Sequence, residues 1–351
     1  MTTVTLGMTG LEVYPIAFGA WELGGEWGEF DEQQAIGAIR HARELGVNLF
    51  DTAQGYGFGA SEQLLGRALR DDLDKRRDEV VIATKGGLRM TDEGLVRDAS
   101  PEFLRGGLEN SLRSLGLDYV DVYQVHWPDP NVPFAETAAA LEGLVQEGKI
   151  RHVGVSNYDA AQMAEFTRGR PVETLQPPYH LFRREVEAEV LPYAREHDIG
   201  VLIYGPLAHG LLTGGMDEHA TFAADDWRSQ SHVFEGEAFW RNLEVVRELE
   251  RFAVDELDTS VAQMAIAWTL ANPAVHVAIV GARSPRHVEE SVAAAQVRLS
   301  EVELERIDRI VAGSAAIAGP FPELGRLSTE TSVFTDTNVS QEGSNAQSIE
   351  R

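Results

Sequence analysis

Residues 48–62 read NLFDTAQGYGFGASE, and the rest of the chain is best interpreted outward from this stretch. An apolar strand runs into Asp51, a glycine-rich turn carries Tyr56, and a helix begins near Ser61. A carboxylate and a phenol five residues apart, at the end of a strand, suggest proton-transfer chemistry. The alternative is structural: Asp51 caps the turn and Tyr56 packs on the loop. The other strands of the chain decide between the two.

Short apolar strands alternate with amphipathic helices along the chain. We expect strands at 16–19, 47–50, 80–83, 119–125, 151–155, 173–176, 200–203 and 275–280. Helical patterns cover 31–45, 62–69, 100–115, 133–146, 186–197, 238–257, 261–271, 285–295 and 300–312, and another helix begins after Asp159. This alternation is typical of parallel strands joined by right-handed crossovers, and its length matches a closed barrel better than an open sheet.

The sequence therefore predicts an α/β fold, a single (β/α)8 TIM barrel over residues 1–318. An N-terminal β-hairpin is expected around residues 8–10, and extra helices are expected near the C-terminus. Residues 319–351 lose the periodicity and become polar, which predicts a flexible C-terminal tail.

The composition argues against several classes of function. The chain has 351 residues and a net charge of -26, so binding to nucleic acid or to an anionic membrane is disfavoured. It has no cysteine, which rules out disulfides, thiol nucleophiles and thiolate metal sites. No signal peptide is visible, and no apolar run approaches the roughly 18 residues of a membrane helix. We therefore expect a cytoplasmic protein, and its oligomeric state stays open.

In a barrel of this type, side chains at the carboxyl ends of the strands converge on one face. The predicted set is Trp21, Asp51, Tyr56, Lys85, His126, Trp127, Ser156, Asn157, Gln176, Tyr204 and Arg283. A phenol has a pKa of about 10, and it becomes a useful general acid when a lysine ammonium favours the phenolate. An aspartate keeps that lysine charged, and a histidine beside the phenol can orient a carbonyl oxygen. Together these residue types suit the protonation of an oxyanion as it forms.

Each of these side chains also has an ordinary structural interpretation. Lys85 at a strand end is often a solvated lysine, and His126 before Trp127 is often a core histidine with its hydrogen bonds satisfied. Their shared place on one face favours the catalytic interpretation. No His-Glu-x-x-His or similar spacing occurs, so no metal site is predicted. The nucleophile elbow of serine hydrolases is also missing from the sequence.

A second informative stretch, residues 275–292, reads VHVAIVGARSPRHVEESV. Ser284 is a candidate N-cap and Pro285 a first-turn proline, so a helix begins here. The cationic side chains nearby are Arg283, Arg286 and His287. Free amides, the helix dipole and these cations favour an anion site, such as one for a dinucleotide phosphate. The alternative is a capped helix with solvated arginines. No strand-GxGxxG-helix unit occurs near the start, so a Rossmann domain would not hold the dinucleotide.

Several ordered motifs resemble those of the aldo-keto reductase superfamily over roughly residues 3–315. They are NLFDTAQGYGFGASEQLLGRAL, ATKGG, DYVDVYQVHWPD, IRHVGVSNY, LQPPYHLFRREVE, VLIYGPLAHGLLTG and IVGARSPRHVEESV. The chain looks most similar to a bacterial branch near the general aldo/keto reductases, the inositol dehydrogenases and the potassium-channel β subunits.

The resemblance implies a catalytic tetrad of Asp51, Tyr56, Lys85 and His126, in which Tyr56 gives or takes the proton. It implies NADP(H) as the cofactor, with NAD(H) as the alternative. The residues that it implies for binding the cofactor are Ser156, Asn157, Gln176, Tyr204, Gly205, Pro206, Leu207, Leu211, Gly281, Arg283, His287, Glu290 and Ser291. Among these, Arg283 would reach the adenosine 2′-phosphate and Glu290 the adenine. Trp21 and Trp127 would wall the substrate pocket.

The chain departs from the family pattern at three positions. Val280 stands where the family often has proline, His287 where it has glutamine or arginine, and Ser291 where it has asparagine. The last two lie in the implied adenosine pocket, so they bear on cofactor preference and affinity rather than on the chemistry.

We therefore expect an NADP(H)-dependent aldo/keto reductase that acts on a small carbonyl or alcohol substrate. Two alternatives stay open: an NAD-dependent polyol or inositol dehydrogenase, and a nucleotide-sensing regulatory protein like the potassium-channel β subunits. Residues 205–236 are too long for a plain connection and form a candidate lid, in which Phe222, Trp227 and Phe234 cover apolar surface. The alternative is a loop packed on the barrel.

Overall fold

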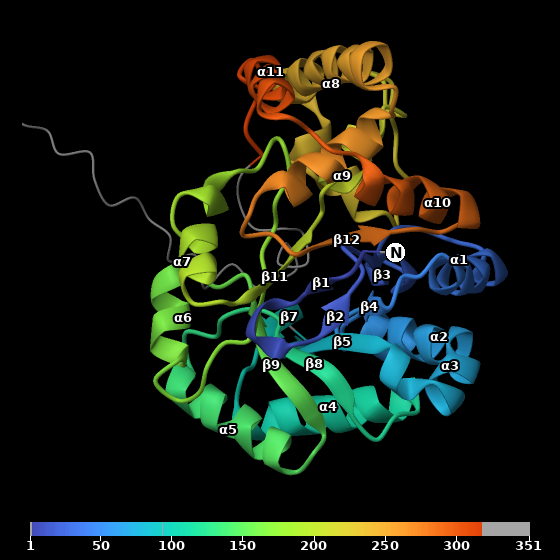
Figure 1. The fold of residues 1–351 in the computed structure, drawn as a ribbon. Coiled ribbons are helices and arrows are strands. Elements are labelled where there is room, and N and C mark those ends of the chain that lie inside the picture. Colours follow the sequence, from blue (N-terminus) through green and yellow to red (C-terminus); the bar gives the residue numbers. More distant parts are fainter. Residues whose placement is uncertain (1, 93, 318–351) are drawn as a thin grey trace, which may run out of the picture.

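Parallel strands close into a barrel in the computed structural model, which describes residues 2–92 and 94–317 (Figure 1). Within these residues the barrel strands are β3 (Ile16–Gly19), β4 (Leu49–Asp51), β5 (Val81–Gly86), β8 (Val120–Val125), β9 (Ile150–Ser156), β10 (Thr174–Gln176), β11 (Gly200–Tyr204) and β12 (Val277–Gly281). Their order around the barrel is β10-β11-β12-β3-β4-β5-β8-β9. The predicted α/β fold, a (β/α)8 TIM barrel, is confirmed. The tail predicted at 319–351 lies outside the described residues.

Helices surround the barrel and bury their apolar faces on it. They are α1 (Glu32–Glu44), α2 (Ala60–Ala68), α3 (Arg70–Lys75), α4 (Pro101–Leu115), α5 (Phe134–Gln146), α6 (Ala160–Phe166), α7 (Val190–Glu196), α9 (Val261–Ala271) and α10 (Pro285–Ala293). Helix α4 is typical: Ser100 accepts a bond from the Phe103 amide, Pro101 opens the first turn, and Gly116 ends the helix with a φ of 69°. The leucines that it buries recur at helical spacing, at Leu104, Leu108, Leu112 and Leu115.

The predicted N-terminal hairpin closes one end of the barrel. Strands β1 (Val4–Thr5) and β2 (Glu12–Val13) pair antiparallel. The buried side chains of Leu6, Leu11 and Val13 pack against residues inside the barrel, among them Leu49 and Val122. Because this hairpin fills the amino ends of the strands, the opposite end is the one that is able to hold a ligand.

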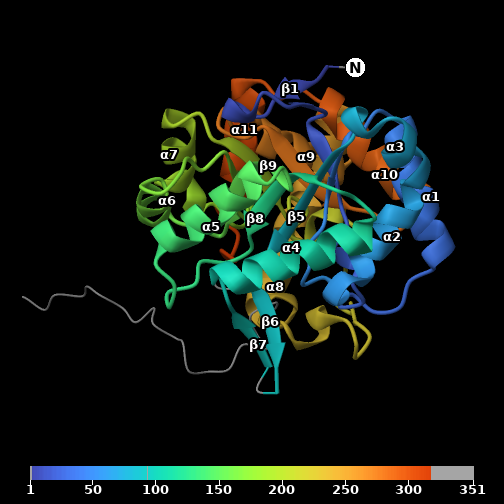
Figure 2. The same ribbon diagram turned by 90° about the horizontal axis from the view of Figure 1, so that it is seen from below.

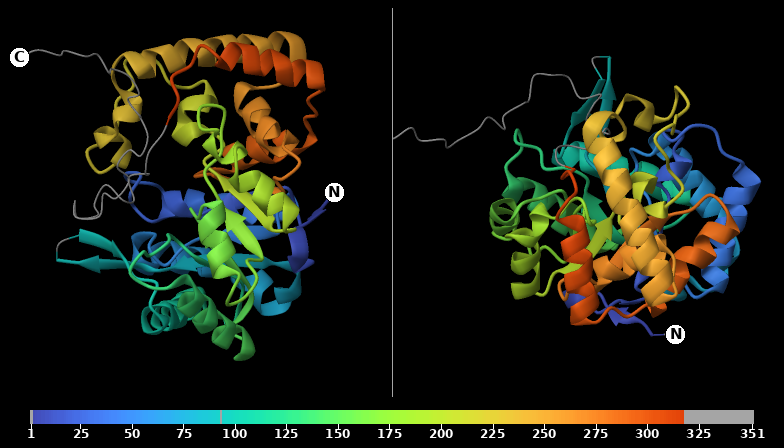
Figure 3. Two further views of the ribbon diagram at one scale, coloured as in Figure 1. Left: turned by 90° about the vertical axis from the view of Figure 1, so that its left-hand side faces the viewer. Right: turned by 90° about the horizontal axis from the view of Figure 1, so that it is seen from above.

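The extra C-terminal helices lie over the barrel. Helix α8 (Gly236–Leu257) and helix α11 (Glu301–Val311) lie side by side, as Figure 3 shows. Ser300 caps α11 in a capping box with Glu303. Residues 205–236 form short 3-10 turns, η6 (Ala208–Thr213), η7 (Trp227–Gln230) and η8 (His232–Phe234). Within residues 2–92 and 94–317, every helix is too short or too polar to span a bilayer.

Two features differ from the sequence prediction. An antiparallel hairpin of β6 (Leu88–Thr91) and β7 (Gly94–Arg97) follows β5 and projects from the barrel (Figure 2). The helix expected at 186–197 is divided into a 3-10 turn, η5 (Glu185–Glu187), and α7. Glu187 accepts a bond from the Tyr179 hydroxyl at 2.7 Å, a tertiary contact that competes with a continuous helix.

Candidate active site

Lys85 lies at the centre of a buried polar cluster at the carboxyl ends of the strands. It stands near the end of β5, and its side chain is fully buried. Its Nζ atom donates to Asp51 Oδ2 at 2.7 Å, to the Thr52 carbonyl at 2.8 Å and to the Tyr56 hydroxyl at 3.1 Å. An ammonium has three N–H donors, so these contacts use all of them. Lys85 is therefore fixed behind Tyr56 instead of being solvated.

His126 completes the predicted tetrad in space. It follows β8, and its backbone N–H donates to the Gly86 carbonyl at 2.9 Å. Its ring stands edge-on to the Tyr56 ring, with the two centroids 5.6 Å apart. Residues from β4, β5, β8 and the loop after β4 thus meet at one point, although they are as much as 75 positions apart in the sequence. The arrangement puts a phenol between an ammonium and an imidazole.

Gln176 ties the tetrad to the next part of the site. Its Nε2 atom donates to Asp51 Oδ1 at 2.8 Å and to Gln124 Oε1 at 2.9 Å. Both oxygens of Asp51 are therefore hydrogen-bonded, one to an amide and one to an ammonium. Gln124 is a buried partner that the sequence analysis did not identify, because a polar residue inside a strand carries no motif of its own.

A hydrogen-bonded row continues from Gln176 along the rim. Ser156 Oγ donates to the Gln176 carbonyl at 2.9 Å and accepts from Asn157 Nδ2 at 3.0 Å. Asn157 has a φ of 62°, in the left-handed region that asparagine tolerates better than most residues. The Tyr204 hydroxyl donates to Asn157 Oδ1 at 2.8 Å, which fixes the position of the Tyr204 ring.

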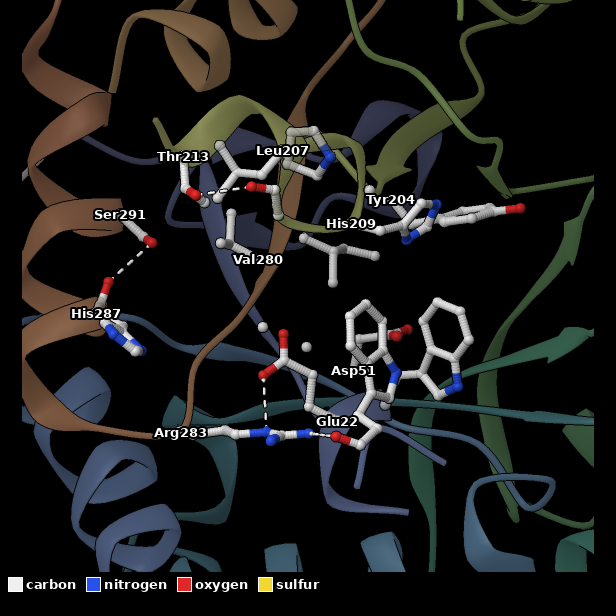
Figure 4. Close-up of a pocket in the computed structure, with 18 of the residues that line it drawn as sticks. Glu22, Asp51, Tyr204, Leu207, His209, Thr213, Val280, Arg283, His287 and Ser291 are labelled. Carbon is white, nitrogen blue, oxygen red and sulfur yellow. Dashed lines mark hydrogen bonds and ion pairs between the residues drawn. The ribbon is translucent and has the colours of Figure 1, made fainter. Parts of the chain in front are cut away.

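A cavity of about 490 Å³ runs from the tetrad to the first turn of α10 (Figure 4). The predicted residues that line it are Trp21, Asp51, Tyr56, His126, Ser156, Asn157, Gln176, Tyr204, Gly205, Pro206, Leu207, Gly281, Arg283, His287, Glu290 and Ser291. Lys85 does not line it, because that side chain lies behind Tyr56 and Asp51. Residues from the two informative stretches of the sequence therefore share one cavity.

Besides Lys85, two predicted residues lie outside the cavity lining. Leu211 is fully buried within η6. Trp127 packs with Leu88 and Leu95 of the β6–β7 hairpin, and the Arg97 guanidinium lies 5.3 Å from its ring centroid. The unpredicted hairpin thus packs on Trp127, which does not line the cavity that Trp21 lines.

The α10 end of the cavity is built around Arg283. Its Nη2 donates to the Trp27 carbonyl at 2.6 Å, and its Nε lies 3.4 Å from Glu22 Oε2. Ser284 occupies the N-cap position of α10 without a side-chain capping bond, and Pro285 follows in the first turn. Deeper in α10, Glu290 Oε1 accepts from Ser260 Oγ at 3.0 Å, and Ser291 Oγ donates to the His287 carbonyl at 2.9 Å. Arg286 does not line the cavity.

Aromatic rings cover the cavity beside Tyr56. Trp21 stacks on Trp227 of η7 with centroids 5.9 Å apart and planes 13° apart, and Trp27 meets Trp227 edge-on at 5.4 Å. The Trp227 amide donates to the Glu26 carbonyl at 3.0 Å, so the segment 205–236 is joined to the loop after β3. His209 of η6 packs against Trp227 at 5.1 Å, and burial lowers the pKa of its imidazole to about 3.

Several cavity residues were missed by the sequence analysis. They are Gly19, Glu22, Trp27, His209, Gly210, Thr213, Gly215, Met216, Arg228, Ala262, Ile279 and Val280. Glu22 and His209 follow β3 and β11 closely, so extending the strand-end rule a few residues into each loop would have included them. Arg228 follows the end of β11 by 24 residues and carries no such signal.

Comparison with known proteins identifies the family. A model of the aldo/keto reductase family matches residues 15–312. The chain belongs to the aldo/keto reductase family. This aldo/keto reductase is therefore an oxidoreductase that acts on carbonyl or alcohol groups and uses a nicotinamide cofactor, NAD(P)H.

The relatives of this aldo/keto reductase are similar over most of its length. It is 43% identical over 290 residues to the aldo-keto reductase YhdN of Bacillus subtilis (strain 168), covering 82% of this chain and 87% of the relative. It is 33% identical to the NADH-specific methylglyoxal reductase of Escherichia coli (strain K12), and the match covers 86% of this chain and 96% of the relative. Among solved structures, the glycerol dehydrogenase AKR11B4 from Gluconobacter oxydans superposes with a TM-score of 0.82 at 37% identity. The superposition covers 91% of this chain and 98% of the dehydrogenase chain.

Proposed function

We propose that this enzyme is an NADP(H)-dependent carbonyl reductase in which Tyr56 is the general acid and base. The observation that carries the proposal is the 3.1 Å hydrogen bond from Lys85 Nζ to the Tyr56 hydroxyl, in a buried site where Asp51 holds the lysine. When bound, the cofactor supplies or accepts the hydride at the carbonyl carbon. Tyr56 gives its proton to the carbonyl oxygen in reduction and removes it from the alcohol in oxidation.

Lys85 and Asp51 prepare Tyr56 for this role. The fixed ammonium stabilises the phenolate that is left after Tyr56 has given up its proton. Asp51 compensates the charge of Lys85, which would otherwise be costly to bury. The edge-on contact between the His126 and Tyr56 rings supports a role for His126 in orienting the carbonyl oxygen. Lys85, Asp51 and His126 would therefore all assist the transfer of the Tyr56 proton to the carbonyl oxygen.

The polar row along the rim fits the carboxamide of a nicotinamide. Both N–H donors of Gln176 are used by Asp51 and Gln124, so its Oε1 atom is the one that can accept from a ligand amide. Ser156 and Asn157 lie beside it in the same cavity. Tyr204, anchored through its hydroxyl, would present its ring to the nicotinamide.

The α10 end of the cavity favours NADP(H). Arg283 and His287 line the cavity where α10 begins, which is an environment for the 2′-phosphate. Glu290, held by Ser260, would accept from the adenine amino group. NAD(H) is the competing cofactor, because the Escherichia coli relative is an NADH-specific enzyme. That relative also suggests small carbonyl compounds, such as methylglyoxal, as the substrates to try first.

The test of the proposed acid and base is the Tyr56→Phe variant. It should keep its fold and its affinity for NADPH in isothermal titration calorimetry, and lose roughly 10²–10⁴-fold in carbonyl turnover. Tyr14→Phe is the matched control, because it removes a buried hydroxyl that bonds to the Val292 carbonyl outside the cavity lining. Carbonyl turnover by Tyr56→Phe close to that of the wild type would refute the assignment.

A polyol dehydrogenase is the second candidate function, favoured by the similarity to the Gluconobacter oxydans glycerol dehydrogenase. Two sets of rates separate the two candidate functions. One is measured with glycerol and other polyols plus NAD⁺ or NADP⁺, and the other with aldehydes and ketones plus NADH or NADPH. A clear preference for polyol oxidation with NAD⁺ would replace our proposal.

A further inference from the structure

Glu22 places a carboxylate inside the cationic end of the cavity. It lies on the 3-10 turn η2 (Trp21–Leu23) directly after β3, and the pairing of Gly19 with Gly281 sets this turn beside the end of β12. The Glu22 side chain reaches over Gly281, where an added Cβ atom would lie 2.5 Å from Glu22 Oε1. Both residues line the cavity, and Figure 4 shows the Glu22 carboxylate directed at Arg283.

The loop after β3 holds Arg283 at two points. The Arg283 guanidinium contacts the Glu22 carboxylate through Nε and the Trp27 carbonyl through Nη2. The side chains of Glu22 and Arg283 are 25% and 27% exposed, so water screens the ion pair only in part. The cation that would meet a ligand phosphate is thus already engaged by an acidic side chain of the protein.

The charges around Glu22 are those expected around a bound anion. Burial raises the pKa of its carboxyl, and the charge of Arg283 opposes this shift most, followed by Arg228 and His287. Arg283, Arg228 and His287 all line the cavity. Asp226, which forms an ion pair with Arg228, is the one carboxylate among the charges that act on Glu22. Glu22 therefore occupies the part of the cavity where cationic groups converge.

We propose that Glu22 is a specificity-determining residue that competes with the cofactor 2′-phosphate for Arg283 and so reduces the preference for NADP(H) over NAD(H). This inference rests on the proposed function, in which Arg283 meets that phosphate. A phosphate beside Arg283 is repelled by a neighbouring carboxylate, so NADP(H) binds only when Glu22 moves away or takes up a proton. NAD(H) has a ribose hydroxyl at this place, and a carboxylate is able to accept a hydrogen bond from it.

The experiment compares two ligands that differ only in the 2′-phosphate, adenosine 2′,5′-bisphosphate and adenosine 5′-monophosphate. Their dissociation constants are measured by isothermal titration calorimetry with the wild type, Glu22→Gln and Glu29→Gln. Glu29 is an exposed residue of the same loop outside the cavity lining, so its variant controls for the change in net charge. Glutamine keeps the shape of Glu22 and removes its charge.

We expect Glu22→Gln to bind the bisphosphate about tenfold more tightly, a change of about 1.4 kcal/mol, and the monophosphate within about twofold of the wild type. Glu29→Gln should bind both ligands like the wild type. An unchanged affinity of Glu22→Gln for the bisphosphate, or an equal gain for both ligands, overturns the inference.

A third variant, Arg283→Met, separates this inference from the proposed function. If its bisphosphate-to-monophosphate affinity ratio equals that of the wild type, the phosphate does not meet Arg283 and the cofactor assignment itself is wrong. If Arg283→Met loses bisphosphate affinity while Glu22→Gln leaves it unchanged, only the role of Glu22 is wrong. A loss in Arg283→Met together with a gain in Glu22→Gln supports both.

Discussion

Lys85 Nζ lies 2.7 Å from Asp51 Oδ2, and the two side chains are 0% and 4% exposed. Burying two charges is costly unless their geometry is good and their other hydrogen-bonding groups are satisfied. Here the remaining donors of Lys85 bond to the Thr52 carbonyl and the Tyr56 hydroxyl, and the second oxygen of Asp51 accepts from Gln176. The complete hydrogen bonding explains how an ammonium is kept inside a barrel.

Removing the charge of Asp51 should therefore destabilise the whole protein as well as its site. We expect Asp51→Asn to lower the free energy of unfolding by about 3–5 kcal/mol, because it leaves a buried ammonium without its counter-ion. Urea unfolding measures the change. Asp71→Asn is the control: Asp71 pairs with Lys75 on the surface, where both side chains are largely exposed, and its loss should have no measurable effect. Equal effects of the two substitutions would contradict this account of the buried pair.

Two helical glycines should respond oppositely to the same substitution. In α2, a Cβ atom on Gly66 would lie 2.6 Å from the Leu115 carbonyl oxygen, a backbone atom at the end of α4. Gly66→Ala should therefore cost about 1–3 kcal/mol in unfolding free energy. In α4, a Cβ on Gly106 would have no neighbour within 4 Å, so Gly106→Ala should add about 0.5–1 kcal/mol. Chemical denaturation of both variants checks the signs, and two shifts in the same direction would count against this packing of α2 on α4.

The buried imidazole of His209 should make the protein sensitive to acid. Burial lowers its pKa from 6.5 to about 3, so below pH 6.5 the unfolded chain binds a proton there that the folded chain does not. Stability is then lost as the pH falls from about 6.5 toward 3, and His209 alone accounts for about 2 kcal/mol between pH 7 and pH 5. His180 acts in the same direction, because burial also lowers its pKa.

The His209→Asn variant isolates this contribution, because asparagine tolerates the φ of 56° at this position. Unfolding free energies at pH 7 and pH 5 should differ less in the variant than in the wild type. If the two proteins lose the same stability between these pH values, His209 is not the group responsible.

Tyr204 should affect cofactor binding more than the chemical step. Tyr204→Phe keeps the ring and removes the hydroxyl that donates to Asn157, so the ring loses its anchor. A lost hydrogen bond of about 0.5–1.5 kcal/mol corresponds to roughly a two- to tenfold weaker affinity for NADPH, which titration calorimetry measures. The rate at saturating cofactor should change less than the affinity, and the reverse pattern would argue against the assigned position of the nicotinamide.

The strands of the barrel were predictable because their side chains are buried on both faces and read as short apolar runs. Val81 to Ala83 and Val201 to Ile203 are examples. Once the strands are located, the residues at their ends are predictable too, because a parallel barrel brings the carboxyl ends of its strands together. Asp51, Lys85 and His126 meet as expected on these grounds alone.

The loops were less predictable because their positions depend on tertiary contacts. The β6–β7 hairpin is short and partly polar, so its sequence shows no clear strand pattern and it was not predicted. The packing of Trp127 under Arg97 depends on this hairpin, so it was not predicted either. Glu22 follows β3 closely, but nothing in Trp21-Glu22-Leu23 indicates its contact with Arg283. Its place follows from the register of β3 with β12, which the sequence of either strand does not specify.

The indole rings of Trp21 and Trp27 line the cavity, and Trp227 stacks on the first of them. Indole emission in the near ultraviolet overlaps the absorption of a reduced nicotinamide ring, so a dihydronicotinamide bound here would quench it by energy transfer. The enzyme therefore carries its own optical signal of occupancy, and stopped-flow mixing would time each arrival and departure without any label.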